Sequence, residues 1–179
     1  MKYNSIILSG LPLSGNSTLA KSLSEIFHLK LHSIGELFKL EWKKQHPNQE
    51  IPFEQYWKNI SIEENKKVDE YTRRLFENEN LIGEFRYSIS YKKLNVLLVL
   101  LVADLNIRIQ RAMLSGRYKG KSPQEIESIL QKREQDEVYM GKQIYGSDYD
   151  FRDPKNYHLV INSGKITLGD SIKIIKSAM

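Results

Sequence analysis

The sequence predicts an α/β fold in which helices cover both faces of a parallel sheet, and three observations lead to this prediction. Short apolar segments alternate along the chain with segments whose apolar residues recur every three or four positions. Residues 94–103 (LNVLLVLLVA) show no polar alternation, as expected of a strand buried on both faces of a parallel sheet. A glycine-containing loop closes the first apolar segment and leads into a helical pattern. Together they favour a three-layer α/β/α arrangement around a five-stranded parallel sheet.

The N-terminal half contains three of the predicted strands. Ser5–Ser9 (SIILS) is short, apolar and rich in β-branched residues, which is typical of a buried strand. Beyond Gly15, a helix is predicted by the spacing of its apolar residues, which are Leu19, Leu23, Ile26 and Phe27. The elements expected next are a strand at Leu29–Ser33, helices at Gly35–Lys44 and Ser61–Glu79, and a strand at Asn80–Glu84.

The C-terminal half continues the alternation after the apolar strand at 94–103. A helix is expected next, and its apolar positions are Leu105, Ile109, Ala112 and Met113. A polar, basic loop follows at residues 115–121. The last predicted strand is 157–162 (YHLVIN), and a terminal helix is marked by Leu168, Ile172 and Ile175.

A helix is expected to begin directly after the basic loop. Ser122 is its N-cap, Pro123 occupies the first helical position and Glu125 is the acidic third position of a capping box. The apolar residues Ile126, Ile129 and Leu130 continue the helical pattern. The start of this helix is therefore predicted from local chemistry alone.

Composition excludes several classes of protein. The chain is 40% hydrophobic and 27% charged, which suits one compact domain over residues 1–179 and excludes a disordered tail protein. The absence of cysteine excludes disulfides, thiolate metal sites and cysteine nucleophiles. A formal net charge of +5 fits a protein that handles phosphate, whether in a nucleotide, a nucleic acid or an anionic surface.

No targeting or membrane segment is predicted. Residues 1–10 contain one lysine and only a very short apolar run, unlike a signal peptide. The longest apolar run, at 94–103, is about half of the roughly 20 residues that a membrane span needs. We therefore expect a cytoplasmic protein without a membrane partner. The four histidines are scattered and show no metal-ligand spacing.

Residues 10–18 (GLPLSGNST) have the spacing of a phosphate-binding P-loop, G-x-x-x-x-G-K-[ST], at the point where the first strand meets the first helix. The glycines allow successive backbone N–H groups to surround a phosphate, and the helix N-terminus adds a favourable partial charge. The Ser17 hydroxyl is placed to ligate Mg²⁺. The predicted ATP-binding residues are Gly10, Leu11, Pro12, Leu13, Ser14, Gly15, Asn16, Ser17 and Thr18.

Asn16 stands where the P-loop motif has lysine. An amide donates a hydrogen bond but carries no charge, so one contact that would offset the charge of the β- and γ-phosphates is missing. A basic residue from the loop at 117–121 is a candidate substitute for that charge. The alternative interpretation of 10–18 is a plain strand-to-helix turn, because glycine, serine and asparagine are ordinary turn residues.

Five further segments follow the P-loop in a definite order. They are SIGELF at 33–38, EFR at 84–86, the arginines Arg108 and Arg111, RE at 133–134, and YGSD at 145–148 ahead of a strand ending in Ile161 and Asn162. In this order and spacing the chain resembles the P-loop nucleoside monophosphate kinases, and specifically the compact cytidylate kinases of the archaeal type. The resemblance covers nearly the whole chain. It implies a P-loop NTPase fold and an ATP- and Mg²⁺-dependent kinase whose acceptor is CMP or dCMP.

The resemblance also implies roles for individual residues. It places Ser33, Gly35, Glu36 and Arg86 in the acceptor site, and Arg86 suits a phosphate because its planar fork allows bidentate contact. Glu84, an acidic residue at the end of a predicted strand, is expected to hold Mg²⁺ through water together with Ser17; the alternative is a salt bridge to a neighbouring helix. The implied catalytic arginines are Arg111, Arg117 and Arg133. A helical acceptor-binding segment is implied at 34–79 and a lid at 114–144.

Two more positions depart from the family pattern. Residues 138–141 (VYMG) stand where family members have an arginine, so one lid contact is expected to be missing. Phe85 replaces a small residue, which the resemblance places near the acceptor phosphate. The aromatic residues Phe53, Tyr56 and Trp57 are interpreted as core or lid packing rather than as a platform for base stacking.

Two other functions stay open at the level of sequence. The same fold could phosphorylate another nucleotide or a small metabolite, because the base identity rests on resemblance alone. The chain could also bind nucleotide or RNA without turnover, which Asn16 and Phe85 favour. The retention of Ser17 and Arg86 argues against a binding function without turnover. The pattern does not favour a nucleic-acid partner and predicts no oligomeric state.

Overall fold

The computed structural model describes residues 2–51 and 53–179, without the side chains of Glu54 and Lys58. Within that range the strands form a five-stranded parallel sheet in the order β2-β3-β1-β4-β5. This confirms the predicted α/β fold class. The strands are β1 (Ser5–Gly10), β2 (Lys30–Ser33), β3 (Leu81–Glu84), β4 (Val96–Val102) and β5 (Leu159–Asn162).

The helices fall where the periodicity predicts them, with one addition. They are α1 (Asn16–Phe27), α2 (Ile34–Gln45), α3 (Phe53–Lys58), α4 (Ile62–Asn78), α5 (Leu105–Leu114), α6 (Pro123–Tyr145) and α7 (Leu168–Ala178), with short 3₁₀ turns at Ile89–Tyr91 and Pro154–Asn156. The predicted capping box at the start of α6 is present, because Ser122 Oγ accepts from the Glu125 N–H while the Glu125 carboxylate accepts from the Ser122 N–H. None of the helices in the described ranges is long and apolar enough to cross a membrane.

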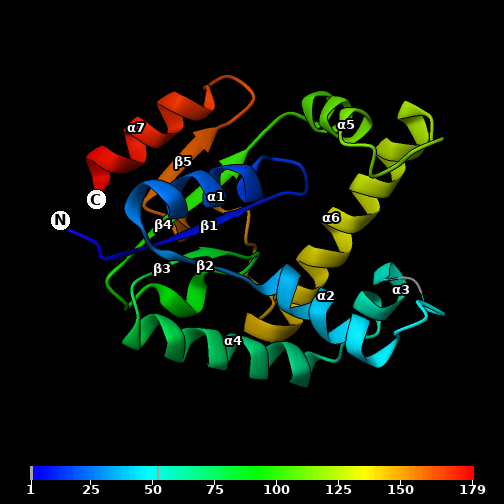
Figure 1. The fold of residues 1–179 in the computed structure, drawn as a ribbon, viewed down its shortest axis with the longest axis horizontal. Coiled ribbons are helices and arrows are strands. Elements are labelled where there is room, and N and C mark those ends of the chain that lie inside the picture. Colours follow the sequence, from blue (N-terminus) through cyan, green and yellow to red (C-terminus); the bar gives the residue numbers. More distant parts are fainter. Residues whose placement is uncertain (1, 52) are drawn as a thin grey trace.

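Apolar side chains fill both faces of the sheet. On one face, α1 and α7 pack their apolar residues against Ile6, Leu8 and Val99. On the other face, Phe76 of α4 packs against Ile7, Leu98 and neighbouring aromatic rings. Figure 1 shows α7 and α4 on opposite sides of the strands, and α6 running from α5 towards α4. The strongest burial is therefore at β1 and β4, which explains the unbroken apolar run in β4.

The carboxyl ends of the strands meet along one edge of the sheet. Ser33, the last residue of β2, is paired in register with Glu84, the last residue of β3, and Glu84 is paired with Leu8 of β1. Ser163, directly after β5, donates its N–H to the Val102 carbonyl at the end of β4. In open α/β sheets, ligands bind at this edge where the strand order reverses. The segment 10–15, between β1 and α1, lies at the centre of it.

The short helix α3 was not predicted. Its Phe53 and Trp57 rings pack against α2, with Trp57 5.0 Å from Phe38 and Phe53 5.7 Å from Trp42, measured between ring centroids. Trp42 Nε1 also donates to the Ile51 carbonyl at 2.8 Å. Because these rings pack on one another, the structure confirms their interpretation as packing residues.

Replacing Gly83 by alanine is expected to destabilise the protein by about 1–3 kcal/mol through overpacking. A methyl group there would lie 2.6 Å from Phe85 Cε1 and 2.8 Å from Phe76 Cζ, in the apolar layer between β3 and α4. Urea denaturation of G83A measures the loss. Gly169→Ala, in α7 with its nearest neighbour at 3.9 Å, is the matched control and should match or exceed wild-type stability. Equal stabilities for the two variants would contradict this packing argument.

Candidate functional site

The loop between β1 and α1 has the backbone of a phosphate cradle. Its φ angles are positive at Gly10 (156°), Leu13 (65°) and Gly15 (99°). The N–H groups of residues 15–18 donate to no acceptor among the described residues, whereas the N–H of Leu19 donates to the Gly15 carbonyl at 3.0 Å. Unpaired N–H groups at a helix N-terminus form a site for an anion. The loop is therefore more than a turn, and it has the donors that a phosphate needs.

The outside of the loop is held by α5 and by the residue after β5. Arg111 Nη1 donates to the Leu13 carbonyl at 3.1 Å, and its Nη2 donates to the Ser163 carbonyl at 2.6 Å. Ser163 Oγ in turn donates to the Ser14 carbonyl at 2.5 Å. These bonds occupy carbonyl groups of the loop and bring a guanidinium to its rim. Arg111 Nη1 would lie 3.8 Å from a Cβ at Gly15.

The Asn16 side chain spans the base of the loop. In the amide orientation that satisfies both atoms, its nitrogen donates to the Ser9 carbonyl at 3.1 Å and its oxygen accepts from the Gly10 N–H at 3.2 Å. The amide thus joins the first turn of α1 to the end of β1. Asn16 stabilises the loop, and the positive charge of the usual lysine is absent.

Glu84 lies between the P-loop and the end of β2. Its Oε1 accepts from Ser17 Oγ at 2.7 Å, and its Oε2 accepts from Ser33 Oγ at 3.0 Å. The structure therefore brings together the two residues predicted to act at the metal, and it joins one predicted acceptor residue to them. The Ser33 hydroxyl also caps α2, accepting from the Glu36 N–H at 3.4 Å.

The pair of Ser17 and Glu84 has the chemistry that Mg²⁺ requires. Both donors are hard oxygen atoms, and Mg²⁺ in phosphate-transfer sites is held by one or two protein groups together with phosphate and water. A site of three or more His, Cys, Asp or Glu side chains is not present in the described part of the chain. The residues present therefore fit an ion that is completed by substrate phosphates rather than one caged by protein.

Arg86 and Arg133 meet on one carboxylate. Arg86 Nη2 and Arg133 Nε both donate to Oε1 of Glu137, at 3.1 Å and 3.0 Å. Arg86 follows β3, whereas Arg133 and Glu137 lie one helical turn apart on α6. The guanidinium of Arg86 also stacks on the Phe151 ring, 5.5 Å from its centroid. Two predicted site arginines, one expected in the acceptor site and one in the lid, are thus neighbours.

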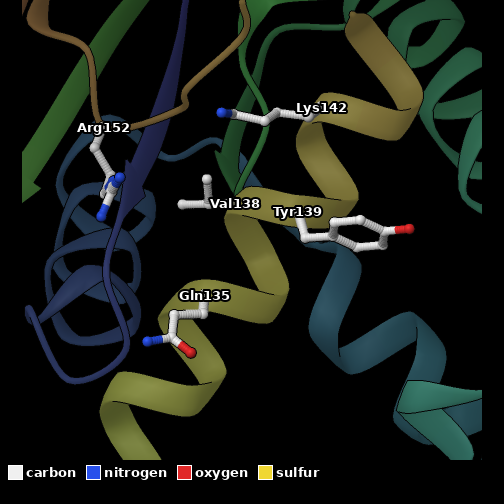
Figure 2. A pocket seen from close by; sticks show the side chains of 5 residues that line it. All are labelled: Gln135, Val138, Tyr139, Lys142 and Arg152. Atoms are coloured by element: carbon white, nitrogen blue, oxygen red, sulfur yellow. The ribbon is translucent and has the colours of Figure 1, made fainter. Parts of the chain in front are cut away.

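A second charged network joins α5, α6 and the loop before β5. Glu134 accepts from the buried Arg108 at 3.2 Å and from Arg152 at 2.7 Å. Arg152 also pairs with Asp150, and its guanidinium holds the pKa of that carboxyl below its usual range. Beside Arg152 a shallow depression of about 280 Å³ runs along α6. Figure 2 shows its lining residues, which are Gln135, Val138, Tyr139, Lys142 and Arg152.

Some predicted site residues lie outside this cluster. Arg117 is exposed in the turn between α5 and α6, and its side chain pairs with no other residue in the described ranges. Glu36 pairs with Lys39 on the surface of α2. A Cβ at Gly35 would meet only the Ser33 hydroxyl, at 3.8 Å. Gly35 therefore lies beside the hydroxyl that binds Glu84. In the described ranges, neither Arg117 nor the Glu36 carboxylate contacts Glu84 or Arg86.

The Phe85 side chain does not lie where the family resemblance implies. It is 8% exposed, and its ring packs in the apolar layer 6.0 Å from Phe76 and 5.0 Å from Tyr91. The chain stays extended directly after β3, where the Phe85 N–H donates to the Leu8 carbonyl, so the side chains of Glu84 and Phe85 point to opposite sides of the sheet. The expectation that Phe85 stands at the acceptor phosphate is wrong.

The sequence does not predict three polar contacts of this cluster. They are the pairing of Glu134 with Arg108 and Arg152, the role of Glu137, and the contact of Ser163 with the P-loop. Arg133 and Glu137 are four residues apart in a predicted helix, a spacing that brings the two side chains together. That signal was available in the sequence. No local sequence signal predicts the role of Ser163, because its contact with the P-loop joins residues 149 positions apart.

Replacing Asn16 by lysine is expected to tighten nucleoside triphosphate binding about 10-fold, the effect of roughly one charge-assisted contact. The N–H groups of residues 15–18 stay in place because they belong to the start of α1, while the bonds of the Asn16 amide to Ser9 and Gly10 are lost. Isothermal titration with ATP measures the change. Asn16→Asp is the matched control, since it has nearly the same shape and the opposite charge, and it should weaken binding. Wild-type affinity in both variants would mean that this side chain does not face the phosphates.

Three comparisons place the chain among known proteins. The family model described as the cytidylate kinase-like family matches residues 51–165. Over 176 residues the chain is 31% identical to the cytidylate kinase of Archaeoglobus fulgidus, covering 97% of this chain and 93% of that protein. It is 30% identical to the cytidylate kinase of Methanothermobacter thermautotrophicus, covering 89% of this chain and 95% of the relative.

The fold is shared with a solved kinase structure. Shikimate kinase from Bacteroides thetaiotaomicron superposes with a TM-score of 0.61 at 12% identity, over 97% of each chain. At that identity the likeness concerns the fold, which is that of the P-loop kinases. The family-model match and the identity to the archaeal relatives, together with the phosphate cradle, show that the chain belongs to the cytidylate kinase-like family of nucleoside monophosphate kinases.

Proposed function

We propose that the protein transfers the γ-phosphoryl group of ATP to CMP or dCMP, releasing ADP and the nucleoside diphosphate. The observation that carries the proposal is the arrangement at the sheet edge, where the P-loop N–H groups, the Ser17–Glu84 pair and the Arg86–Arg133 pair occur together. The names of the curated relatives support the choice of cytidine nucleotides.

The proposed reaction is a direct displacement. A phosphate oxygen of the acceptor attacks the γ-phosphorus of ATP, the bond to the β-γ bridging oxygen breaks, and that oxygen leaves with ADP. Little covalent chemistry is required of the protein, so catalysis consists of holding the two phosphates in line and offsetting their charge. The loop N–H groups and Arg111 serve the donor, while Arg86 and Arg133 serve the acceptor and the transferred group.

Mg²⁺, when bound, neutralises phosphate charge, and we assign its protein contacts to Ser17 and, through water, to Glu84. In the structure these two side chains are hydrogen-bonded to each other at 2.7 Å. Ser33 donates to the other oxygen of the same carboxylate and so fixes its orientation. The ordered carboxylate reduces the reorganisation that binding requires.

We further propose that residues 34–79 bind the acceptor and that residues 114–144 form a lid. Arg117 lies in the exposed turn of that lid, between α5 and α6. Lid closure would bring it to the phosphates, excluding water at the same time. The compartment proposed for the reaction is the cytoplasm.

One observation favours a second candidate function, a nucleotide-binding protein without turnover. The P-loop carries no lysine, and Asn16 uses its amide inside the loop. Such a protein would bind ATP and transfer nothing. An acceptor other than CMP, within the same fold, is the other alternative.

A coupled assay for ADP release tests the proposal, with ATP, Mg²⁺ and each nucleoside monophosphate in turn. The expected result is turnover that is fastest with CMP or dCMP. Turnover selective for another nucleotide would retain the kinase and change the acceptor. If no nucleoside monophosphate gives ADP release, in protein that still binds ATP by titration, the result would favour the non-catalytic function.

A further inference from the structure

Glu137 is a charged residue in the interior of the molecule, with 7% of its side chain exposed. A carboxylate at this depth is tolerated only when it is paired, because burial removes its hydration. Its Oε1 accepts from both Arg86 and Arg133. One negative charge is therefore shared by two guanidinium groups that come from distant parts of the chain.

The position of Arg86 is determined from several directions. Its carbonyl accepts from Ser9 Oγ at 2.6 Å, which ties its backbone to the end of β1. Its guanidinium lies over Phe151 and against Glu137. The Tyr87 hydroxyl donates to the Glu137 carbonyl at 2.8 Å and so fixes α6 to the same segment. Burial raises the pKa of Tyr87, so this hydroxyl stays a donor at neutral pH.

The pair formed by Arg86 and Arg133 retains a net positive charge and N–H donors without an acceptor in the described ranges. Two guanidiniums on one carboxylate leave a net charge of +1 on the group. Nη1 of Arg86 and both Nη atoms of Arg133 have no acceptor among the residues that the structure describes, and 39% of the Arg133 side chain is exposed. Arg86 Nε lies 2.9 Å from Glu137 Oε2 but outside hydrogen-bonding geometry. The group can therefore still bind an anion.

We propose that Glu137 is a positioning residue for phosphoryl transfer: its carboxylate sets Arg86 and Arg133 side by side, so that their free N–H groups meet the acceptor phosphate together. The inference rests on the proposed function and adds a residue that the sequence did not single out. Because Glu137 and Arg133 share α6 while Arg86 belongs to the sheet edge, the carboxylate also couples the lid helix to the acceptor site.

A merely structural salt bridge makes a different prediction. If Glu137 only pins α6 to the sheet, Glu137→Gln lowers the unfolding temperature and leaves the kinetics of the folded enzyme unchanged. If Glu137 aligns the arginines, E137Q removes the negative charge that offsets the repulsion between the two guanidiniums. Their alignment is then lost, and the net charge of the group rises from +1 to +2. The added charge then tightens acceptor binding, whereas turnover falls.

The experiment compares wild type, E137Q and Asp136→Asn in the coupled assay with CMP, and measures CMP and ATP binding by titration calorimetry. Asp136 is the matched control, since it directly precedes Glu137 on α6 and, among the residues that the structure describes, pairs only with exposed Lys132. We expect kcat of E137Q to fall about 100-fold, as a misplacement of about 1 Å can cause, without a rise in the KM for CMP. D136N should behave as wild type. A kcat of E137Q within threefold of wild type, or an increase, overturns the inference.

Two further measurements test the inference if wild type is inactive or if E137Q does not fold. If wild type phosphorylates no nucleotide, the proposed function fails, and CMP binding alone then decides: an unchanged or weakened affinity in E137Q overturns the inference, and a tightening of about 10-fold or more supports it. If E137Q does not fold, Glu137→Asp replaces it. The shorter carboxylate cannot reach both guanidiniums, so kcat should fall at least about 10-fold, and a wild-type kcat overturns the inference.

Discussion

Arg86→Met is expected to lower kcat/KM for the acceptor by about 100- to 1,000-fold, the effect of removing one charged donor from a preorganised site. Methionine retains the aliphatic volume over Phe151 but no N–H group. The donor side should be unaffected, since Arg86 contacts neither the P-loop side chains nor Arg111 in the described structure. Steady-state kinetics with varied CMP and fixed ATP measure the loss.

The interpretation of that variant requires two controls. Arg73→Met removes a half-buried arginine of α4 that pairs with Glu77, and it should leave kcat/KM unchanged. Arg86→Lys keeps the charge and loses the planar fork, so its activity should lie between those of wild type and methionine. Part of any lost stability in R86M comes from Glu137, which then has only Arg133 as a partner. A fully active R86M would remove Arg86 from the acceptor site.

Glu84→Gln is expected to lower turnover about 100-fold and to raise the Mg²⁺ concentration that gives half of the maximal rate. The amide preserves shape and can still accept a hydrogen bond from Ser17 or Ser33, so the local structure is kept while the negative charge is removed. Initial rates over a Mg²⁺ titration measure both effects.

Glu79→Gln provides the matched control for the metal experiment. Glu79 lies just before β3, is exposed and pairs with Lys30 at 3.3 Å. Its replacement removes the same charge from the opposite end of β3 and should shift neither the rate nor the Mg²⁺ dependence. An E84Q enzyme with the Mg²⁺ dependence of wild type would show that Glu84 orders the two serines and does not serve the metal.

Most elements could be predicted because their signals are local. The unbroken apolar run in β4, the periodic apolar residues of α1 and the capping box of Ser122 and Glu125 each occupy a short window of the chain. The helix α3 gave no such signal. Its six residues make fewer than two turns, and their aromatic rings are ordered by contact with Phe38 and Trp42 of α2.

The site could be predicted in part for the same reason. The P-loop is a contiguous motif, and its backbone has the expected open N–H groups. The Phe85 side chain does not reach the site although its neighbours Glu84 and Arg86 belong to the motif, because successive side chains of an extended segment point to opposite sides of the sheet. The Glu36 carboxylate pairs with Lys39, three residues later on α2, and the role of Glu36 in the acceptor site stays a prediction. That pair could have been read from helical spacing.

The sequence by itself determined the α/β class, the phosphate loop and the loss of its lysine, because these depend on residues close together in the chain. The tertiary structure decided which charges meet. Arg86 and Glu137 are 51 positions apart, and Ser17 and Glu84 are 67 apart. Their contacts exist only because the strand order places the ends of β1 and β3 side by side and because α6 lies across that edge. Long-range pairing follows from the packing of whole elements, which no short window of sequence contains.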